Sequence, residues 1–301
     1  MDTVLITGGT GLIGRNLSEK LKTRGYPVIV LSRNTKHNTE VNQYYWDPDN
    51  QEIDNASVEK ASYIVHLAGA GVGDKRWTER RKKEIIDSRV KTAELIHKAV
   101  MESGTKLKAF ISISGIGYYG TITSEKIFAE GDPPADDFLG ETCRLWEEAA
   151  DRFSGSGTRV VKIRTGIVLS GEGGVITRLI TPVRFGIGSP VGNGKQYVPW
   201  IHISDLCEIF IKAIEDSNIT GAFNAAAPEH ITNRDLMRSL AGVCRKPFWL
   251  PSVPSILMKI IFGEMSGILL EGSRVSCNKI TSSGFNFRFP DLQNALADLL
   301  Q

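Results

Sequence analysis

The feature that most constrains the fold is a glycine-rich loop near the N-terminus, which lies between a strand pattern and a helix pattern. Val4–Thr7 is a short, β-branched run and predicts a buried strand. Residues 8–14 follow, with a glycine at every third position. Apolar residues then recur at helical spacing as far as Gly25, a residue type that commonly ends helices, and residues 26–31 predict a second strand. This order predicts a strand–helix–strand unit with the glycine loop at the start of its helix.

The spacing Gly8-x-x-Gly11-x-x-Gly14 predicts a phosphate-binding turn. In such turns one glycine allows the sharp bend, a second lets the backbone approach a pyrophosphate, and a third lets the helix pack against the strand. Free N–H groups and the helix dipole then bind the phosphates. The spacing differs from the G-x-G-x-x-G of the standard dinucleotide fingerprint, so a glycine-rich turn without a ligand is the alternative. The strand–helix–strand context favours the dinucleotide site.

The end of the second strand predicts which cofactor binds. NAD-binding units usually place Asp or Glu about 20 residues beyond the loop, on the ribose 2′-hydroxyl. Here that place is taken by Arg33, which follows Ser32. A guanidinium group pairs well with a 2′-phosphate. The sequence therefore predicts NADP(H), and an exposed surface arginine without this role is the alternative.

Further strand and helix patterns alternate along the chain. The predicted strands are residues 63–67, 110–114 and 159–163, and the predicted helices are residues 78–101, 141–153 and 206–215. The alternation predicts an α/β fold with a Rossmann-type, doubly wound parallel sheet. Ligands of such sheets bind outside the carboxyl ends of the strands. We therefore expect the glycine loop and the ends of the other strands to line one crevice, whereas His66, inside a strand, is expected in the core.

The domain organisation is predicted to be unequal. We expect residues 1–170, joined by 205–228, to form the NADP-binding Rossmann domain. Residues 171–204 and 229–301 are expected to form a small, mostly helical subdomain on the substrate side. Its first part is rich in glycine and carries Arg178, Arg184 and Lys195. This composition is consistent with a lid over an anionic substrate, or with a plain connection that has solvated charges.

Composition excludes several classes of protein. The chain has 301 residues with 36 Lys and Arg against 34 Asp and Glu, and this near-neutral charge argues against nucleic-acid and membrane-surface partners. None of the four cysteines forms a C-x-x-C pair, so we expect no metal site and a reducing compartment. No run reaches the roughly 18 apolar residues of a membrane span, and the N-terminus lacks a basic signal region. We expect a cytoplasmic protein that acts on a small molecule.

Several segments resemble a known family. The loop with Leu67-Ala68-Gly69 and the strand that ends at Ser114 look like the extended short-chain dehydrogenase/reductases. More narrowly, the chain resembles the YfcH-type "epimerase family" proteins, often labelled sugar-nucleotide epimerases. The segments that carry this resemblance are Lys75-Arg76-Trp77, Ser88-Arg89, Gly117-Tyr118-Tyr119-Gly120, Trp146-Glu147, and residues 164–169 and 182–205. Together they span essentially the whole chain.

The resemblance implies a set of NADP contacts at the strand ends. The implied contacts are Gly8, Thr10, Gly11, Leu12, Ile13 and Gly14 for the pyrophosphate; Ser32 and Arg33 for the 2′-phosphate; Leu67, Ala68 and Gly69 for the adenosine and ribose side; Glu84 and Arg89 on the following helix; and Arg164 and Val168 on the nicotinamide side. For Arg89 the alternative is a surface arginine paired with Glu84 or Asp87.

The chain departs from the catalytic pattern of this family. Ordinary members use Tyr-x-x-x-Lys with a serine one strand earlier, and the lysine lowers the tyrosine pKa so that the phenol can transfer a proton. Aligned on Trp146-Glu147, the tyrosine position is Leu139 and the lysine position is Cys143. Only Ser114 is retained, and we expect it to hydrogen-bond a substrate carbonyl. Of the two neighbouring phenols, Tyr118 is the candidate acid and Tyr119 is assigned to packing.

The predicted function is therefore that of an atypical, NADP(H)-binding reductase or sugar-nucleotide epimerase-like enzyme with an unknown small polar substrate. The alternative is a non-catalytic NADP(H) sensor or binding protein, because such a protein would keep the cofactor loop and lose the Tyr/Lys pair. His202 and Asp205 resemble a catalytic dyad, but Asp205 is expected to cap the helix that begins at Leu206. The wider family suggests a homodimer through helices 78–101 and 141–153.

Overall fold

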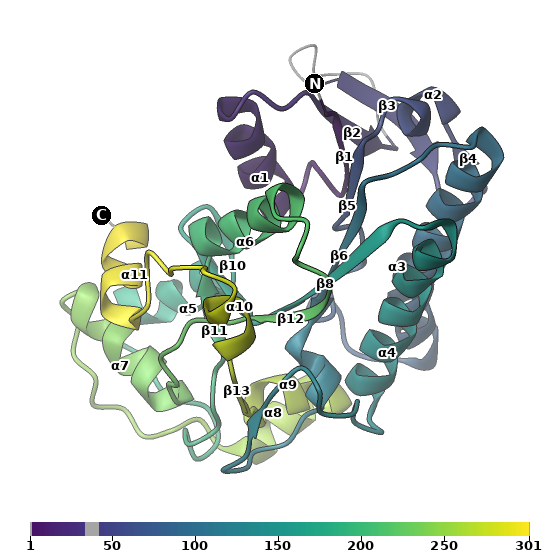
Figure 1. Ribbon diagram of the computed structural model, residues 1–301. Coiled ribbons are helices and arrows are strands. Elements are labelled where there is room, and N and C mark those ends of the chain that lie inside the picture. The colour runs from purple at the N-terminus through teal and green to yellow at the C-terminus, as the bar shows by residue number, and fades with distance from the viewer. Residues whose placement is uncertain (1, 34–41, 301) are drawn as a thin grey trace.

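An eight-stranded sheet forms the centre of the protein (Figure 1). The computed structural model describes residues 2–33 and 42–300. The strands, in spatial order, are β12 (Gly221–Ala225), β8 (Arg159–Thr165), β6 (Ala109–Gly115), β5 (Tyr63–His66), β1 (Val4–Thr7), β2 (Val28–Ser32), β3 (Asn42–Asp47) and β4 (Glu52–Ile53). Neighbouring strands run parallel except for β3 and β4. The predicted Rossmann-type, doubly wound fold is confirmed.

The winding of the sheet reverses between β1 and β5. β1 pairs with β2 on one side, where Thr7 lies opposite Leu31, and with β5 on the other, where Thr7 lies opposite His66. The chain first builds outward through β2 and β3, then returns to β5 and builds the opposite way through β6, β8 and β12. The connections at the carboxyl ends of β1 and β5 therefore diverge, and such a point is where ligands of α/β sheets bind.

Helices cover both faces of the sheet. α1 (Leu12–Thr23) and α6 (Ile203–Glu215) lie on one face, and α2 (Asn55–Glu59), α3 (Glu79–Ser103) and α4 (Phe138–Asp151) lie on the other (Figure 1). Side chains of β1 point alternately into the two layers, because Ile6 packs in the cluster with α1 and α6 while Leu5 packs in the cluster with α3. A strand buried on both faces is almost wholly apolar, as the N-terminal run is. The homodimer through α3 and α4 stays a prediction.

The C-terminal region is mostly helical, as predicted. It contains α5 (Val175–Arg184), α7 (Asn233–Val243), α8 (Ser255–Phe262), α9 (Gly267–Leu270), α10 (Asn278–Ser282) and α11 (Leu292–Leu300). Two small sheets join it to the main body: β10 (Gly173–Gly174), β9 (Ile167–Ser170) and β11 (Trp200–His202) form one, and β13 (Arg274–Val275) with β7 (Ile127–Phe128) forms the other. Its own apolar core lies around Trp200, Leu236 and Leu240. Within residues 205–228, α6 and β12 return to the main sheet.

Two local expectations need correction. Residues 175–184 form α5 and not a loop, because Ile176, Ile180 and Val183 bury one face of a helix between the surrounding glycines. The pattern of residues 286–289 predicts a short final strand or turn. These residues form no strand, and the N–H groups of Arg288 and Phe289 donate to Asp205. No helix among residues 2–33 and 42–300 is long and apolar enough to cross a membrane.

Candidate functional site

The glycine loop folds so tightly that side chains are excluded at two of its positions. Gly8 has a φ of +67°, and a Cβ atom there would lie 3.0 Å from the backbone N of Ala68. A Cβ atom at Gly14 would lie 2.4 Å from the backbone O of Gly8. These neighbours are backbone atoms, which cannot move unless β1 or β5 moves with them. The third glycine therefore lets α1 pack closely against the loop, as its spacing predicts.

α1 begins at this loop with open N–H groups. Its N-cap is Gly11, no side chain accepts a hydrogen bond at this cap, and its first turn contains no acidic residue. The first N–H groups of the helix, at Leu12 and Ile13, and the positive end of its dipole are therefore not neutralised by a carboxylate of the helix's own first turn. A phosphate is the ligand that such a helix start binds best.

Thr7 joins the ends of β1 and β5 beside the loop. Its Oγ1 accepts hydrogen bonds from the N–H groups of Leu67 at 3.1 Å and Ala68 at 3.2 Å, and lies 2.8 Å from Nδ1 of His66. His66 is fully buried, and burial lowers its pKa to about 4, so the ring is neutral at physiological pH. The expected core histidine is confirmed. These contacts hold the backbone of residues 67–69 against the loop.

Arg33 stands at the carboxyl end of β2, next to the loop. It is exposed, and it has no hydrogen-bond or ion-pair partner among residues 2–33 and 42–300. An unpaired guanidinium beside an open helix start adds a second positive group to the same edge of the sheet. Together they form a surface suited to a ligand with several phosphates.

A cavity of about 430 Å³ lies between the strand ends and the C-terminal region. Four of the predicted site residues line it: Ile13, Arg89, Ser114 and Val168. Leu139 and Cys143, the positions of the missing tyrosine and lysine, also line it from α4. Neither transfers protons near neutral pH, because leucine has no acidic proton and burial raises the pKa of the Cys143 thiol to about 11.

Arg89 reaches the cavity from α3 and is only 7% exposed. Its Nη1 donates hydrogen bonds to the carbonyl groups of Ala70 at 3.0 Å and Ile85 at 2.8 Å. Within the described part of the chain, its Nε and Nη2 have no hydrogen-bond partner. The guanidinium lies 4.6 Å from the centre of the Trp146 ring on α4. Burial lowers the pKa of Arg89 to about 10, so the side chain is still a cation at neutral pH.

The alternative interpretation of Arg89, a surface arginine paired with a neighbouring acid, is wrong. Glu84 pairs with Arg81 at 2.6 Å, and Asp87 pairs with Lys83 at 2.7 Å. Arg89 is therefore an internal cation without a carboxylate partner. Glu84 itself is absent from the cavity lining, and the cofactor contact implied for it stays a prediction.

Ser114 belongs to a buried polar network at the edge of the cavity. Its hydroxyl donates to Oε1 of Glu147 at 2.9 Å. The same carboxylate accepts hydrogen bonds from Nε of Arg164 at 2.7 Å and from its Nη2 at 2.9 Å. Burial works against the charge of Arg164, but the Glu147 carboxylate holds its pKa above the usual value. To hydrogen-bond a substrate carbonyl, as predicted, Ser114 would have to turn its hydroxyl away from Glu147.

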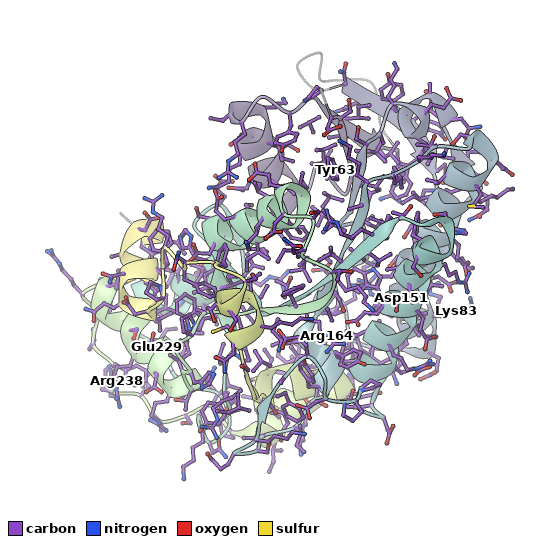
Figure 2. The ribbon with its side chains drawn as sticks, in the orientation of Figure 1. Tyr63, Lys83, Asp151, Arg164, Glu229 and Arg238 are labelled. Atoms are coloured by element: carbon purple, nitrogen blue, oxygen red, sulfur yellow. The ribbon has the colours of Figure 1, made fainter. Side chains whose placement is uncertain are left out.

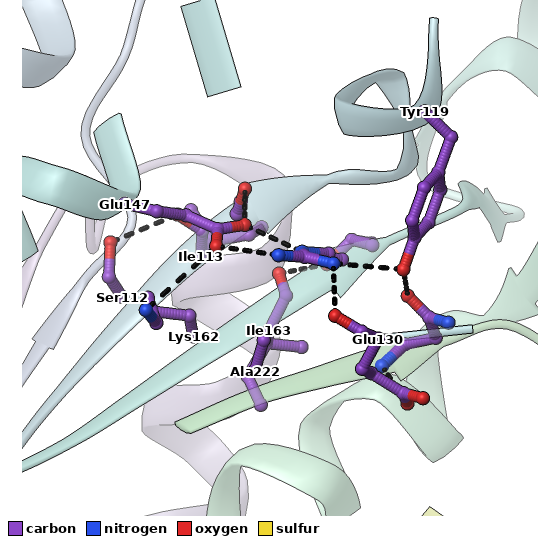
Figure 3. Close-up of polar contacts among 12 residues, drawn as sticks. Ser112, Ile113, Tyr119, Glu130, Glu147, Lys162, Ile163 and Ala222 are labelled. Carbon is purple, nitrogen blue, oxygen red and sulfur yellow. Dashed lines mark hydrogen bonds and ion pairs between the residues drawn. The ribbon is translucent and has the colours of Figure 1, made fainter. Parts of the chain in front are cut away.

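Arg164 lies in the interior of the molecule (Figure 2), and its donors face protein groups. Its Nη1 donates to the Tyr119 hydroxyl at 2.9 Å and to the carbonyl of Glu130 at 3.1 Å. Figure 3 shows Glu147, Tyr119 and Glu130, which accept these hydrogen bonds of the network. The side chain is absent from the cavity lining. In this structure the guanidinium is held by protein groups, and the nicotinamide contact implied for Arg164 stays a prediction. No local sequence pattern indicates the pairing with Glu147, because Glu147 lies on α4 and Arg164 on β8.

The two adjacent tyrosines have different surroundings in the turn of residues 116–119. The ring centre of Tyr118 lies 3.5 Å from Cζ of Arg164, and Tyr118 is absent from the cavity lining. The predicted role of Tyr118 as a proton donor therefore lacks geometric support. Tyr119 lines the cavity, but its hydroxyl donates to Oδ1 of Asn224 at 2.8 Å, and burial raises its pKa to about 12. Its assignment to packing agrees with these contacts.

Glu147→Gln should strongly destabilise the fold, because it leaves the buried Arg164 guanidinium without a counter-charge. Breaking a buried ion pair from one side costs about 3–5 kcal/mol. We expect a loss of that size in the free energy of unfolding, measured by urea denaturation followed by circular dichroism. Glu148→Gln, on the exposed side of the same helix, should change stability little. Equal losses in the two variants would show that the Arg164 network is not a structural centre.

The pair His202 and Asp205 does not form a catalytic dyad. Nδ1 of His202 accepts a hydrogen bond from the N–H of Ser204, so His202 is the N-cap of α6. Asp205 was expected to be the cap, but it accepts hydrogen bonds from the N–H groups of Arg288 and Phe289, both at 2.9 Å.

The residues described contain no cluster of three His, Cys, Asp or Glu side chains that could hold a metal ion.

Comparison with known proteins identifies the family. The model described as "NAD dependent epimerase/dehydratase family" matches residues 4–226. The chain belongs to this family. A second model, described as a domain of unknown function (DUF1731), matches residues 253–299, which include α8 to α11 of the C-terminal region. The resemblance on which the sequence analysis relied is confirmed.

Full-length relatives support the assignment to this epimerase family. The chain is 34% identical to the epimerase family protein SDR39U1 of Mus musculus, over 99% of each protein. It is 34% identical to the epimerase family protein YfhF of Bacillus subtilis, over 99% of this chain and 97% of that protein. The crystal structure of the human epimerase family protein SDR39U1 (isoform2) with NADPH is similar, with a TM-score of 0.89, 33% identity, and coverage of 99% of this chain and 98% of that one.

Proposed function

We propose that the protein binds NADP(H) at the point where the sheet winding reverses, and that it reduces a carbonyl group of a small molecule. The observation that carries the cofactor choice is Arg33, an exposed cation beside the glycine loop that has no ion-pair partner among residues 2–33 and 42–300. A 2′-phosphate is the group that distinguishes NADP(H) from NAD(H), and a guanidinium pairs with it. The NADPH named with the related human structure supports this choice.

The residues of the crevice fit the cofactor from one end to the other. The N–H groups of Leu12 and Ile13 would hold the pyrophosphate above Gly14, where a Cβ atom would block the turn. Arg33 would hold the 2′-phosphate, and the backbone of residues 67–69 would contact the ribose. Val168 and Arg89 would lie at the nicotinamide end. When bound, NADPH supplies a hydride, which adds to the carbonyl carbon, and a proton from water completes the alcohol.

Arg89 takes over the charge of the missing lysine. In ordinary members the lysine lies on the helix that here carries Cys143, whereas Arg89 projects from α3 toward the same place. Arg89 and Cys143 line the same cavity, and the positive charge of Arg89 opposes the rise in the pKa of Cys143 that burial causes. Two of its nitrogen atoms have no protein partner among the residues described. These N–H groups are therefore free to hold the ribose hydroxyls or the substrate oxygen.

Replacing Arg89 by methionine tests this role, because Met has a similar length and no charge. We expect Arg89→Met to weaken NADPH binding about tenfold, which corresponds to the loss of one charge-assisted hydrogen bond. Arg89→Lys should recover most of the affinity. Nicotinamide fluorescence measures binding, and thermal melting shows whether each variant folds. If NADPH affinity fell equally in Arg89→Met and Arg89→Lys, or in neither variant, a role for the positive charge of Arg89 would be contradicted.

A second candidate function, a non-catalytic NADP(H) sensor, is favoured by one observation. The Ser114 hydroxyl donates its hydrogen bond to Glu147 and not to a substrate carbonyl. Leu139, at the position of the family's tyrosine, cannot transfer a proton. The two functions differ in turnover. A reductase should oxidise NADPH with a carbonyl compound in a metabolite panel and should slow in Ser114→Ala. A sensor should bind NADPH without turnover across the panel.

A further inference from the structure

One wall of the cavity is made by the C-terminal region and is mostly apolar. Its side chains come from α5, α7, α9 and the segments between them, and include Val175, Leu179, Val191, Leu236, Ile268 and Leu269. This is the wall that a substrate would contact if the cofactor lies against the strand ends. Most of its side chains are apolar. Its polar side chains are Gln196, Tyr197, Asn233, Glu271 and Ser273, which include one carboxylate and no cation.

Charge is nearly absent from the lining. Among the lining residues only Arg89 and Glu271 carry a charge at neutral pH. Arg89 lies on the cofactor side, and Glu271 is exposed and accepts a hydrogen bond from Oγ1 of Thr123 at 2.5 Å. The substrate wall therefore has no cation, and its single carboxylate repels anions.

Arginines near the lining have other partners. Arg234 donates to Oγ of Ser252 at 3.1 Å. Arg274 pairs with Glu125 at 2.8 Å and lies over the Tyr197 ring at 4.8 Å. Neither guanidinium is part of the cavity lining.

The cations of the glycine-rich segment also stay outside the cavity. Arg178, Arg184 and Lys195 are absent from the lining, and Arg178 donates to the carbonyl of Gly73 at 3.2 Å on the surface. The lid over an anionic substrate that this segment suggested is therefore not formed in the structure. Its charges are solvated, as in the alternative interpretation.

These observations decide between two classes of substrate. A sugar nucleotide brings a diphosphate, and burying its charges without a cationic partner is strongly unfavourable. An uncharged apolar molecule gains from burial against the same wall in proportion to its apolar area. We propose that the cavity takes an uncharged, largely apolar carbonyl compound and excludes nucleotide diphosphates. The proposal rests on the proposed reductase function and replaces the small polar or nucleotide-linked substrate expected from the sequence.

A matched pair of small ketones tests the proposal by binding alone. Prodan, an uncharged aryl ketone dye, is titrated into the full-length protein with and without saturating NADPH, and its emission reports an apolar site. Acetophenone, para-acetylbenzoate and UDP-glucose are then used to displace it. We expect acetophenone to displace prodan at a concentration at least about tenfold lower than para-acetylbenzoate, and UDP-glucose not to displace it.

A cation introduced at the cavity should change this preference. Leu269 lines the cavity and is 38% exposed, so Leu269→Arg leaves the core intact. In this variant para-acetylbenzoate should bind at least about fivefold more tightly than in the unmodified protein. Leu257→Arg is the matched control, because Leu257 is 46% exposed and lies outside the cavity lining. Leu257→Arg should leave the affinities for para-acetylbenzoate and for acetophenone unchanged.

The outcomes separate the two proposals. Failure of NADPH to bind would reject the cofactor assignment, while the prodan titration without NADPH would still report on the cavity. The substrate proposal is overturned if prodan does not bind, or if para-acetylbenzoate or UDP-glucose binds the unmodified protein as tightly as acetophenone. An equal effect of Leu269→Arg and Leu257→Arg would also overturn it, since the probe would then lie elsewhere.

Discussion

Gly14→Ala should weaken NADPH binding by about 100-fold or more and should lower the free energy of unfolding. The added Cβ atom would lie 2.4 Å from the backbone O of Gly8 and 2.5 Å from Cα of Gly9. Relief of this overlap must push α1 away from the loop, which moves the N–H groups that would hold the pyrophosphate. Forced overpacking costs about 1–3 kcal/mol of stability. Fluorescence titration and urea denaturation measure the two effects.

Gly242→Ala is the matched control for this substitution. Gly242 lies within α7, and a Cβ atom there would meet nothing within 4 Å. Alanine favours helix more than glycine does, so stability should stay the same or rise. NADPH binding should not change. Normal NADPH affinity in a folded Gly14→Ala variant would mean that the loop is a glycine-rich turn without a phosphate ligand.

Arg33→Ala should change cofactor preference more than any other single substitution. We expect NADPH affinity to fall about 10- to 100-fold, because a hydrogen bond to a charged group contributes roughly 1.5–3 kcal/mol and each 1.4 kcal/mol is tenfold in affinity. NADH has no 2′-phosphate, so its affinity should stay the same. Calorimetric titration of NADPH and NADH into the unmodified protein and into Arg33→Ala measures the change in the ratio of the two affinities.

Arg238→Ala controls for a general loss of positive charge. Arg238 is an exposed residue of α7, in the C-terminal region (Figure 2). Arg238→Ala should leave the affinities for NADPH and for NADH unchanged. Tighter binding of NADH than of NADPH to the unmodified protein, or an equal loss for both cofactors in Arg33→Ala, would show that Arg33 is an ordinary surface residue.

The fold could be predicted where local patterns and global structure agree. The first strand, the glycine loop and α1 have the residue types that their backbone needs, and β5 and β6 are rich in apolar residues because both faces of these strands are covered. The sequence of β3 has no comparable apolar pattern. It is an edge-side strand in which Trp46 alone is buried, and its polar sequence resembles a loop.

The candidate site was predictable on the cofactor side and much less so on the catalytic side. The loop and Arg33 follow from spacing along one short segment. The surroundings of Arg89 depend on which acids the other cations of α3 attract, and the sequence alone left a pairing with Glu84 or Asp87 open. The pairing of Arg164 with Glu147 joins β8 to α4. The difference between Tyr118 and Tyr119 depends on a single turn of backbone, which sequence patterns do not resolve.

The central claim is that NADPH lies across the strand ends with its nicotinamide ring in the cavity beside Ser114. A crystal structure of the protein grown with NADPH tests this claim most directly. The account predicts the pyrophosphate at the N–H groups of Leu12 and Ile13, the 2′-phosphate at Arg33, and the nicotinamide ring between Val168 and the Arg89 side of the cavity. A cofactor with its 2′-phosphate away from Arg33, or with its nicotinamide ring outside the cavity, would contradict it.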